Sequence, residues 1–101
     1  MLVELNKDNF EQETKFGLKL LEFYTTWCGY CKQQRIELEE LKDSDMWIGL
    51  VDAEELPQVV QKYGIKGFPT FVLLKDGEKT AEIVGFHTKS QLLNRLMNYI
   101  N

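Results

Sequence analysis

Short apolar runs of strand length alternate along this chain with segments of helical periodicity, and this alternation limits the folds open to it. The strand-like runs are residues 2–5, 18–24, 47–51, 70–74 and 80–84. The expected helices are residues 8–17, 28–42, 54–63 and 88–100. Strands separated by helices mostly run parallel through right-handed crossovers, whereas two consecutive strands pair antiparallel. The sequence therefore predicts an α/β fold in the order βαβαβαββα, with a central mixed β-sheet flanked by helices.

Glycine and proline mark the ends of several of these elements. Asp76-Gly77 lies between two strand-like runs and is a strong hairpin signal, because glycine accepts a positive φ. Pro57 is tolerable only in the first turn of the third helix, and Gly64 is placed to end that helix. Gly17 is placed to end the first helix.

Capping patterns indicate where two helices begin. Asp8 followed by Glu11 predicts an aspartate version of a capping box for the first helix, and Thr88 followed by Gln91 predicts one for the last. The apolar stripe of the last helix is expected to be buried and consists of Leu92, Leu93, Leu96, Met97 and Ile100.

Size and charge narrow the classes of partner. The 101 residues predict a single domain, residues 1–101, and a monomer is expected. The formal net charge of −4 comes from interleaved acidic and basic residues, which indicates no nucleic-acid partner and no membrane surface. The longest apolar run, residues 71–74, is too short to span a bilayer, and Glu4, Lys7 and Asp8 interrupt any signal peptide. A cytoplasmic location is expected, although a trimmed exported domain would have the same features.

The only cysteines, Cys28 and Cys31, stand two residues apart. A disulfide between them would close a very small loop and restrict the unfolded chain little, so a purely stabilising role is disfavoured. A structural zinc needs four ligands, and His87 is the only histidine, so no metal is expected. A redox pair fits better: Cys28 at a helix amino terminus has its thiolate stabilised by backbone N–H groups, and Cys31 follows one turn later.

Residues 22–32 (EFYTTWCGYCK), 62–70 (KYGIKGFPT), 75–78 (KDGE) and 84–85 (VG) together resemble the thioredoxin superfamily from end to end. The resemblance implies the thioredoxin fold and a thiol:disulfide oxidoreductase that reduces protein disulfides and needs no bound cofactor. Cys28 would attack the substrate disulfide, and Cys31 would resolve the mixed disulfide. The implied partners are disulfide-containing proteins and an electron donor, either a thioredoxin reductase or a small thiol.

The resemblance also implies a docking surface around the cysteines. Pro69 would be a cis-proline facing them, and Phe68 would offer backbone groups to an extended substrate segment. Taken from the residues alone, Pro69 could be a trans proline entering a strand, Trp27 plain core and Gly85 a strand terminator. The residues expected to contact substrate are Trp27, Gly29, Tyr30, Phe68, Pro69 and Gly85.

Glu22 interrupts an otherwise apolar strand at the position where relatives carry a buried aspartate or glutamate. Burial would raise the pKa of its carboxyl and let it take the proton that Cys31 loses, which makes Glu22 a candidate catalytic residue. The alternative is a carboxylate pointing to solvent from an edge strand. Relatives often carry a lysine where this chain has Leu50, and losing that cation should make Glu22 easier to protonate. Ile36 stands where many relatives have a helix-kinking proline.

Tyr30 replaces the proline of the commoner Cys-Gly-Pro-Cys tetrad. Because periplasmic disulfide isomerases carry Cys-Gly-Tyr-Cys, isomerisation or oxidation remains an alternative to reduction. A binding module with idle or regulatory cysteines is a further alternative, since fold alone does not fix function. His87 is interpreted as a surface residue outside the site.

Overall fold

The computed structural model describes residues 1–100; Asn101, the last residue of the predicted domain, lies outside them. Within these residues the strands are β1 (Leu2–Leu5), β2 (Leu18–Tyr24), β3 (Ile48–Asp52), β4 (Thr70–Lys75) and β5 (Glu78–Val84). The helices are α1 (Phe10–Thr14), α2 (Gly29–Glu39), α3 (Pro57–Tyr63) and α4 (Lys89–Ile100). The element order is the predicted βαβαβαββα.

The strands form one mixed sheet in the order β1-β3-β2-β4-β5. Both β1 and β2 pair with β3 in parallel, whereas β4 pairs antiparallel with β2 and with β5. In the β2–β4 ladder Phe23 lies opposite Thr70, so the carboxyl end of β2 meets the amino end of β4. The segment leading into α2 and the segment leading into β4 therefore leave the sheet at the same edge.

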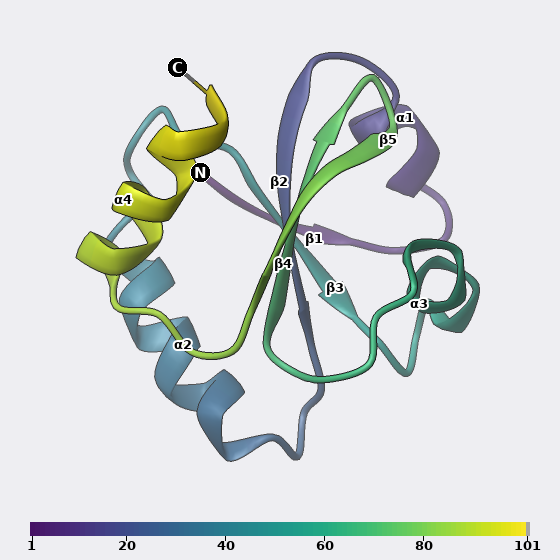
Figure 1. Ribbon diagram of the computed structural model, residues 1–101. Coiled ribbons are helices and arrows are strands. Elements are labelled where there is room, and N and C mark those ends of the chain that lie inside the picture. Colours follow the sequence, from purple (N-terminus) through teal and green to yellow (C-terminus); the bar gives the residue numbers. More distant parts are fainter. Residues whose placement is uncertain (101) are drawn as a thin grey trace.

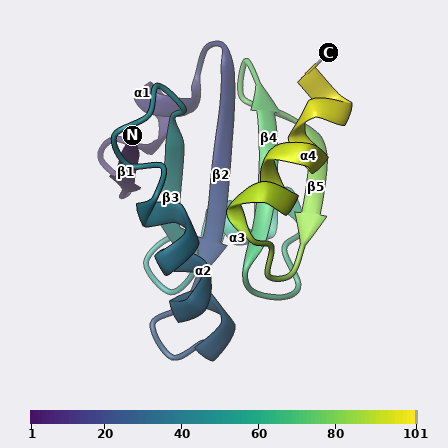
Figure 2. The same ribbon diagram turned by 90° about the vertical axis from the view of Figure 1, so that its left-hand side faces the viewer.

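Helices cover both faces of the sheet. Figures 1 and 2 show α2 and α4 on one face and α1 and α3 on the other. Side chains alternate between the faces along each strand, which gives two apolar cores. The core under α1 and α3 contains Leu5, Leu21, Phe23, Val51, Leu56, Val59, Tyr63, Ile65, Val72 and Leu74. The core under α2 and α4 contains Leu20, Leu38, Leu41, Ile48, Leu50, Phe71, Ile83, Leu92 and Leu96.

Gly49 in β3 shows how tightly the first of these cores is packed. A Cβ atom built on Gly49 would lie 2.7 Å from Leu5 Cδ1, 2.7 Å from a ring carbon of Trp47 and 2.9 Å from Leu21 Cδ2. Real Cβ contacts are essentially never this short. Only glycine fits at this point of the strand without moving its neighbours.

The predicted hairpin is confirmed. Asp76 and Gly77 link β4 to β5, and both have positive φ, 51° and 85°, as the twist of a two-residue hairpin requires. Gly17 holds the turn from outside, because its backbone N–H donates to Asp76 Oδ1 at 2.7 Å. Tyr63 OH donates to the Gly77 carbonyl at 2.8 Å, which ties the hairpin to the end of α3.

The predicted capping box of the first helix is wrong. The helix begins at Phe10, not near Asp8, and its N-cap Asn9 makes no side-chain capping bond. Asn6 Oδ1 instead accepts the backbone N–H groups of Asp8 and Asn9 at 2.8 and 2.9 Å. Both donors precede α1, so Asn6 closes the turn before the helix.

The ends of two other helices refine the predictions. Helix α3 begins at Pro57, three residues later than residue 54, and ends as expected at Gly64, which has a left-handed φ of 67°. The capping box at Thr88 and Gln91 is confirmed by hydrogen bonds of 2.9 and 3.2 Å. The apolar stripe of α4 is only partly buried: Leu92 and Leu96 are in the core, whereas the exposed members are Leu93, Met97 and Ile100.

Candidate functional site

Cys28 lies where β2 has ended and α2 begins. It is the N-cap of α2 and keeps an extended backbone, with φ −84° and ψ 117°. Its Sγ accepts a hydrogen bond of 3.1 Å from the backbone N–H of Cys31, in the manner of a capping side chain. Both cysteines are free thiols. The predicted placement of Cys28 at a helix amino terminus is confirmed, and its sulfur faces the unpaired amides of the first turn.

The two thiols differ in their exposure. Cys28 is half-buried, whereas Cys31 is only 5% exposed. Burial, followed by the contact with Cys28 and the charge of Glu22, raises the pKa of the Cys31 thiol to about 12. Cys31 therefore remains a neutral thiol near neutrality, and only Cys28 is open to a large disulfide substrate.

Phe68 and Pro69 lie beside Cys28. The Cys28 thiol donates to the Phe68 carbonyl at 3.7 Å, and the Phe68–Pro69 peptide bond is cis. The alternative of a trans proline is therefore wrong. Gly85 N–H donates to the Pro69 carbonyl at 2.9 Å, so Phe68, Pro69 and Gly85 form a continuous backbone wall next to the sulfur.

An exposed apolar rim adjoins this wall. Trp27 is 68% exposed and Tyr30 is 65% exposed, which excludes the alternative that Trp27 is plain core. A Cβ on Gly29 or Gly85 would meet nothing within 4 Å, and Gly85 has a φ of 95° just after β5. Large aromatic surface next to open backbone is what an extended polypeptide needs for docking.

Glu22 lies in the interior of the sheet. It sits in β2, the middle strand, and is fully buried, so the alternative of an edge-strand carboxylate is wrong. Its neighbours on β3 and β4 are the apolar Leu50 and Phe71, and neither carboxyl oxygen has a hydrogen-bond partner. Burial raises the pKa of the Glu22 carboxyl from its ordinary 4.5 to about 7, against the opposing effect of Arg35. Glu22 thus titrates near neutrality.

Arg35 is a residue that the sequence reasoning missed. Its Nη2 lies 3.8 Å from Glu22 Oε1, and its guanidinium stacks 4.8 Å from the centre of the Tyr24 ring. The position where relatives carry a lysine is indeed Leu50, but a cation still reaches Glu22 from α2. The available signal was helical spacing, since Arg35 follows Cys31 by four residues and shares its face.

Gln34 was missed as well. It is fully buried in α2, and its side-chain amide makes paired bonds with the backbone of His87. Nε2 donates to the His87 carbonyl at 2.8 Å, and Oε1 accepts from the His87 N–H at 2.9 Å. The loop that follows Gly85 is thereby fixed to the helix that carries both cysteines.

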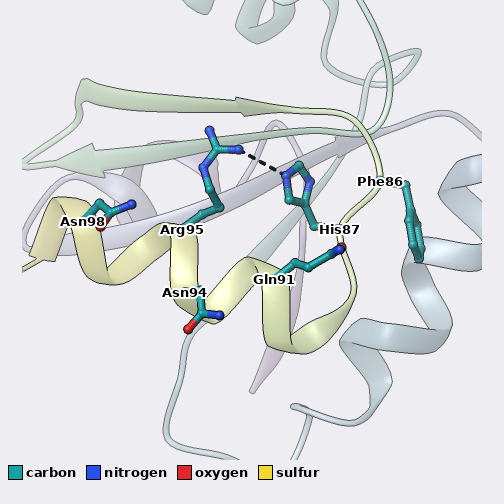
Figure 3. Close-up of a pocket in the computed structure, with 6 residues that line it drawn as sticks. All are labelled: Phe86, His87, Gln91, Asn94, Arg95 and Asn98. Atoms are coloured by element: carbon teal, nitrogen blue, oxygen red, sulfur yellow. Dashed lines mark hydrogen bonds between the residues drawn. The ribbon is translucent and has the colours of Figure 1, made fainter.

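Two hollows lie near these residues, and only one reaches the cysteines. A hollow of about 240 Å³ is lined by Tyr24, Thr25, Thr26, Cys31, Lys32 and Arg35. A second, of about 460 Å³, lies along α4 and is lined by Phe86, His87, Gln91, Asn94, Arg95 and Asn98. In Figure 3 the Arg95 and His87 side chains point toward each other, with Nη1 and Nε2 3.4 Å apart. The α4 hollow contains no residue of the predicted site.

Residues 1–100, the part of the chain that the structure describes, lack two other kinds of feature. Within that range no three His, Cys, Asp or Glu side chains gather in a way that could hold a metal ion. None of the helices there combines the length and the apolar character needed to cross a membrane.

Comparison with known proteins identifies similar chains. The family model Thioredoxin matches residues 1–98. A thioredoxin of Listeria monocytogenes is 34% identical over 103 aligned residues, which cover 99% of this chain and 100% of that protein. A thioredoxin of Staphylococcus haemolyticus is also 34% identical and covers 98% of each chain.

Solved structures give the same result. The Malassezia sympodialis thioredoxin has a TM-score of 0.83 and 30% identity, and the match covers 97% of this chain and 90% of that one. A reduced Schistosoma mansoni thioredoxin has a TM-score of 0.80 and 31% identity over 98% of both chains. The predicted fold class is therefore confirmed.

Proposed function

Because this chain belongs to the thioredoxin family and is a thiol-disulfide oxidoreductase, we propose that it acts chiefly as a reductant of protein disulfides. The observation that carries the proposal is the asymmetry of the thiols. Cys28 caps α2 beside the Phe68 carbonyl, whereas Cys31 is buried one turn later with a pKa raised to about 12. Cys28 is thus placed to attack the substrate disulfide, and Cys31 is placed to resolve the mixed disulfide.

The reaction follows from this placement. The Cys28 thiolate attacks one sulfur of a substrate disulfide, the substrate S–S bond breaks, and the departing substrate sulfur takes up a proton. Cys31 then loses its proton and attacks Cys28 Sγ. The second substrate sulfur leaves as a thiol, and Cys28 and Cys31 become joined by a disulfide. Two electrons pass to the substrate, and the chain is left oxidised.

Glu22 is proposed as the base for the second step. Cys31 cannot release its proton to water quickly when its pKa is about 12. The charge of Glu22 raises the pKa of the Cys31 thiol, and Glu22 has a pKa of about 7. A carboxyl that titrates near the working pH is suited to accept that proton.

Substrate docking is proposed on the wall and rim around Cys28. The backbone of Phe68 would pair with an extended substrate segment in the manner of an added strand. The remaining contacts are assigned to Trp27, Gly29, Tyr30, Pro69 and Gly85. The exposure of Trp27 and Tyr30 and the open space above both glycines support this assignment.

The family implies disulfide-containing substrates and a reductase partner. We further propose that a thioredoxin reductase or a small thiol restores the dithiol, and that residues 1–101 act as a single monomeric domain in the cytoplasm.

Insulin reduction tests the proposed direction. With dithiothreitol as the electron source, the chain is expected to accelerate precipitation of the insulin B chain, and Cys28→Ser is expected to abolish the acceleration. Undiminished acceleration by Cys28→Ser would overturn the proposal.

Two further measurements separate the alternatives. Cys31→Ser is expected to trap disulfide-linked substrates, whereas a binding module would retain its partners equally well with both cysteines replaced. Equilibration with glutathione separates a reductant from an oxidant or isomerase, because an oxidant would hold its disulfide less stably.

A further inference from the structure

The guanidinium of Arg35, on α2, lies close to the buried Glu22 carboxyl and has no role in the function proposed above. We propose that Arg35 is a positioning residue that keeps Glu22 able to receive the proton of Cys31 at neutral pH. This inference rests on the proposed function, in which Glu22 is the base.

The sheet leaves only one direction from which Glu22 can be paired. Within the sheet its partners are Leu50 on β3 and Phe71 on β4, and both are apolar. Both also belong to the core under α2 and α4. The carboxyl therefore faces the helix layer, and from α2 Arg35 brings its Nη2 to 3.8 Å from Oε1.

The ring of Tyr24 supports the Arg35 guanidinium. The guanidinium stacks on Tyr24 at 4.8 Å from the ring centre, and the Tyr24 hydroxyl donates to Glu4 Oε2 at 2.6 Å. The Arg35 side chain is 33% exposed, yet its Nε is buried without a hydrogen-bond partner. A buried, unpaired donor is costly, and its presence beside a buried, unpaired carboxyl indicates that each group stabilises the other electrostatically.

Arg35 and Cys31 share one hollow. The hollow of about 240 Å³ is lined by both residues together with Tyr24, Thr25, Thr26 and Lys32. Arg35 thus lies between the buried carboxyl and solvent, on the same side as the sulfur that must lose its proton.

The groups that act on Glu22 oppose one another. Arg35 on α2 lowers the pKa of its carboxyl, whereas burial and the negative charge of Glu4 on β1 raise it. Cys31 on α2 is neutral before it reacts, and the facing residues of β3 and β4 are apolar. Among the groups within residues 1–100 that shift the pKa of Glu22, Arg35 is the one that favours the ionised carboxylate.

The step itself balances as a proton transfer followed by thiol-disulfide exchange. In the mixed disulfide, the Cys31 S–H bond breaks and its proton passes to the Glu22 carboxylate. The Cys31 thiolate forms a bond to Cys28 Sγ, the bond from Cys28 to the substrate sulfur breaks, and that sulfur leaves as a thiolate and takes up a proton. Glu22 must be ionised when the step begins.

The expected effect follows from the charge lost. An opposite charge within about 4–6 Å shifts a carboxyl pKa by about 1–3 units, and the partial exposure of Arg35 places its effect at the lower end. Removing Arg35 should therefore raise the pH at which resolution becomes fast by about one unit. In a plot of resolution rate against pH, the rising limb marks the ionisation of Glu22. Near neutrality the resolution rate should fall about 5-fold, and at a pH well above the shifted limb it should recover.

The test uses a nitrobenzoate disulfide, which releases a coloured thiolate when cleaved. Cys28 releases the first thiolate, and attack by Cys31 on the resulting mixed disulfide releases the second. The rate of the second release against pH is measured for wild type, Arg35→Met and Arg35→Lys, with Arg95→Met as the matched control. We expect Arg35→Met to move the limb upward, Arg35→Lys to recover most of the shift, and Arg95→Met to leave it in place.

Combination with Glu22→Gln isolates the mechanism. If Arg35 acts through Glu22, Arg35→Met has no further effect on the limb in the Glu22→Gln background. NMR titration of the labelled Glu22 carboxyl in the reduced protein should show the same upward shift in Arg35→Met, and this readout needs no substrate.

The two proposals fail in different ways. A wild-type chain that releases no second thiolate overturns the proposed function and the role of Arg35 with it. A wild type that releases both, with an unchanged limb in Arg35→Met or an equal shift in the Glu22→Gln background, overturns the role of Arg35 alone.

Discussion

Burial of the Glu22 carboxyl makes the stability of the fold depend on pH, and Glu22→Gln measures by how much. In the folded chain the pKa of this carboxyl is raised from 4.5 to about 7. Between these values the unfolded chain has released the proton and the folded chain still holds it. The stability that protonated Glu22 contributes is therefore fully present below pH 4.5 and is lost as the pH rises through about 7.

The size of the effect comes from the same two values. A shift from 4.5 to about 7 corresponds to roughly 3 kcal/mol, at about 1.4 kcal/mol for each unit. Glu22 is fully buried, so solvent screening does not reduce this figure much. Glutamine has nearly the same shape and cannot ionise. Glu22→Gln should match wild type near pH 4 and be more stable by about 3 kcal/mol above about pH 8.

Denaturant unfolding at a series of pH values measures this difference. Both chains are kept reduced, so that the cysteines contribute equally. Other carboxyl groups also titrate, but they are common to both proteins and cancel when the free energies of unfolding are subtracted. The same measurement on Glu39→Gln, an exposed position of α2, gives the background for the comparison.

The pH dependence of the difference in unfolding free energy between wild type and Glu22→Gln tests this reasoning. A difference that does not change with pH would mean that Glu22 titrates alike in the folded and unfolded chains. A wild type that gains stability over Glu22→Gln as the pH rises would mean that the buried carboxylate is favourably paired. Either result would refute the claim that burial has the largest effect on the pKa of the Glu22 carboxyl.

Three further outcomes are expected. Gln34→Ala leaves the His87 N–H and carbonyl without partners and should cost about 2–4 kcal/mol of unfolding free energy, with faster hydrogen exchange at the His87 amide. Trp27→Ala should lower kcat/KM for insulin about 10-fold, as loss of an aromatic anchor does, and should lower the rate with the small nitrobenzoate disulfide much less. Gly49→Ala forces a Cβ against Leu5 and Trp47 and should cost about 1–3 kcal/mol by overpacking, measured by thermal unfolding; an unchanged midpoint would show that the core yields there.

Much of the fold could be predicted because local signals and the global topology agree. The Asp76-Gly77 turn, the glycine that ends α3 and the strand-helix alternation each point to the structure that forms. The placement of Cys28 followed from chain order, since a strand end and a helix start meet there. These features depend on residues near one another in sequence.

The missed features depend on contacts between distant elements. Asn6 is the exception, because it fixes the turn before α1 through bonds to residues only two and three positions away. Arg35 and Gln34 look like ordinary polar residues of a surface helix, and only the packing of α2 over β2 and beside the loop at His87 gives them their roles. Periodicity also overstated the buried stripe of α4, since it indicates a direction but not how far the neighbouring layer extends.

The site joins two parts of the chain that are made at different times. Cys28 and Phe68, which meet at 3.7 Å, are 40 residues apart in sequence, and the β2–β4 ladder is what brings them together. A nascent chain that has emerged only as far as α3 would carry both thiols but not the backbone wall of Phe68, Pro69 and Gly85 that is proposed to select a substrate. We expect reactivity to precede selectivity during synthesis, and timed alkylation of the growing chain would reveal the interval.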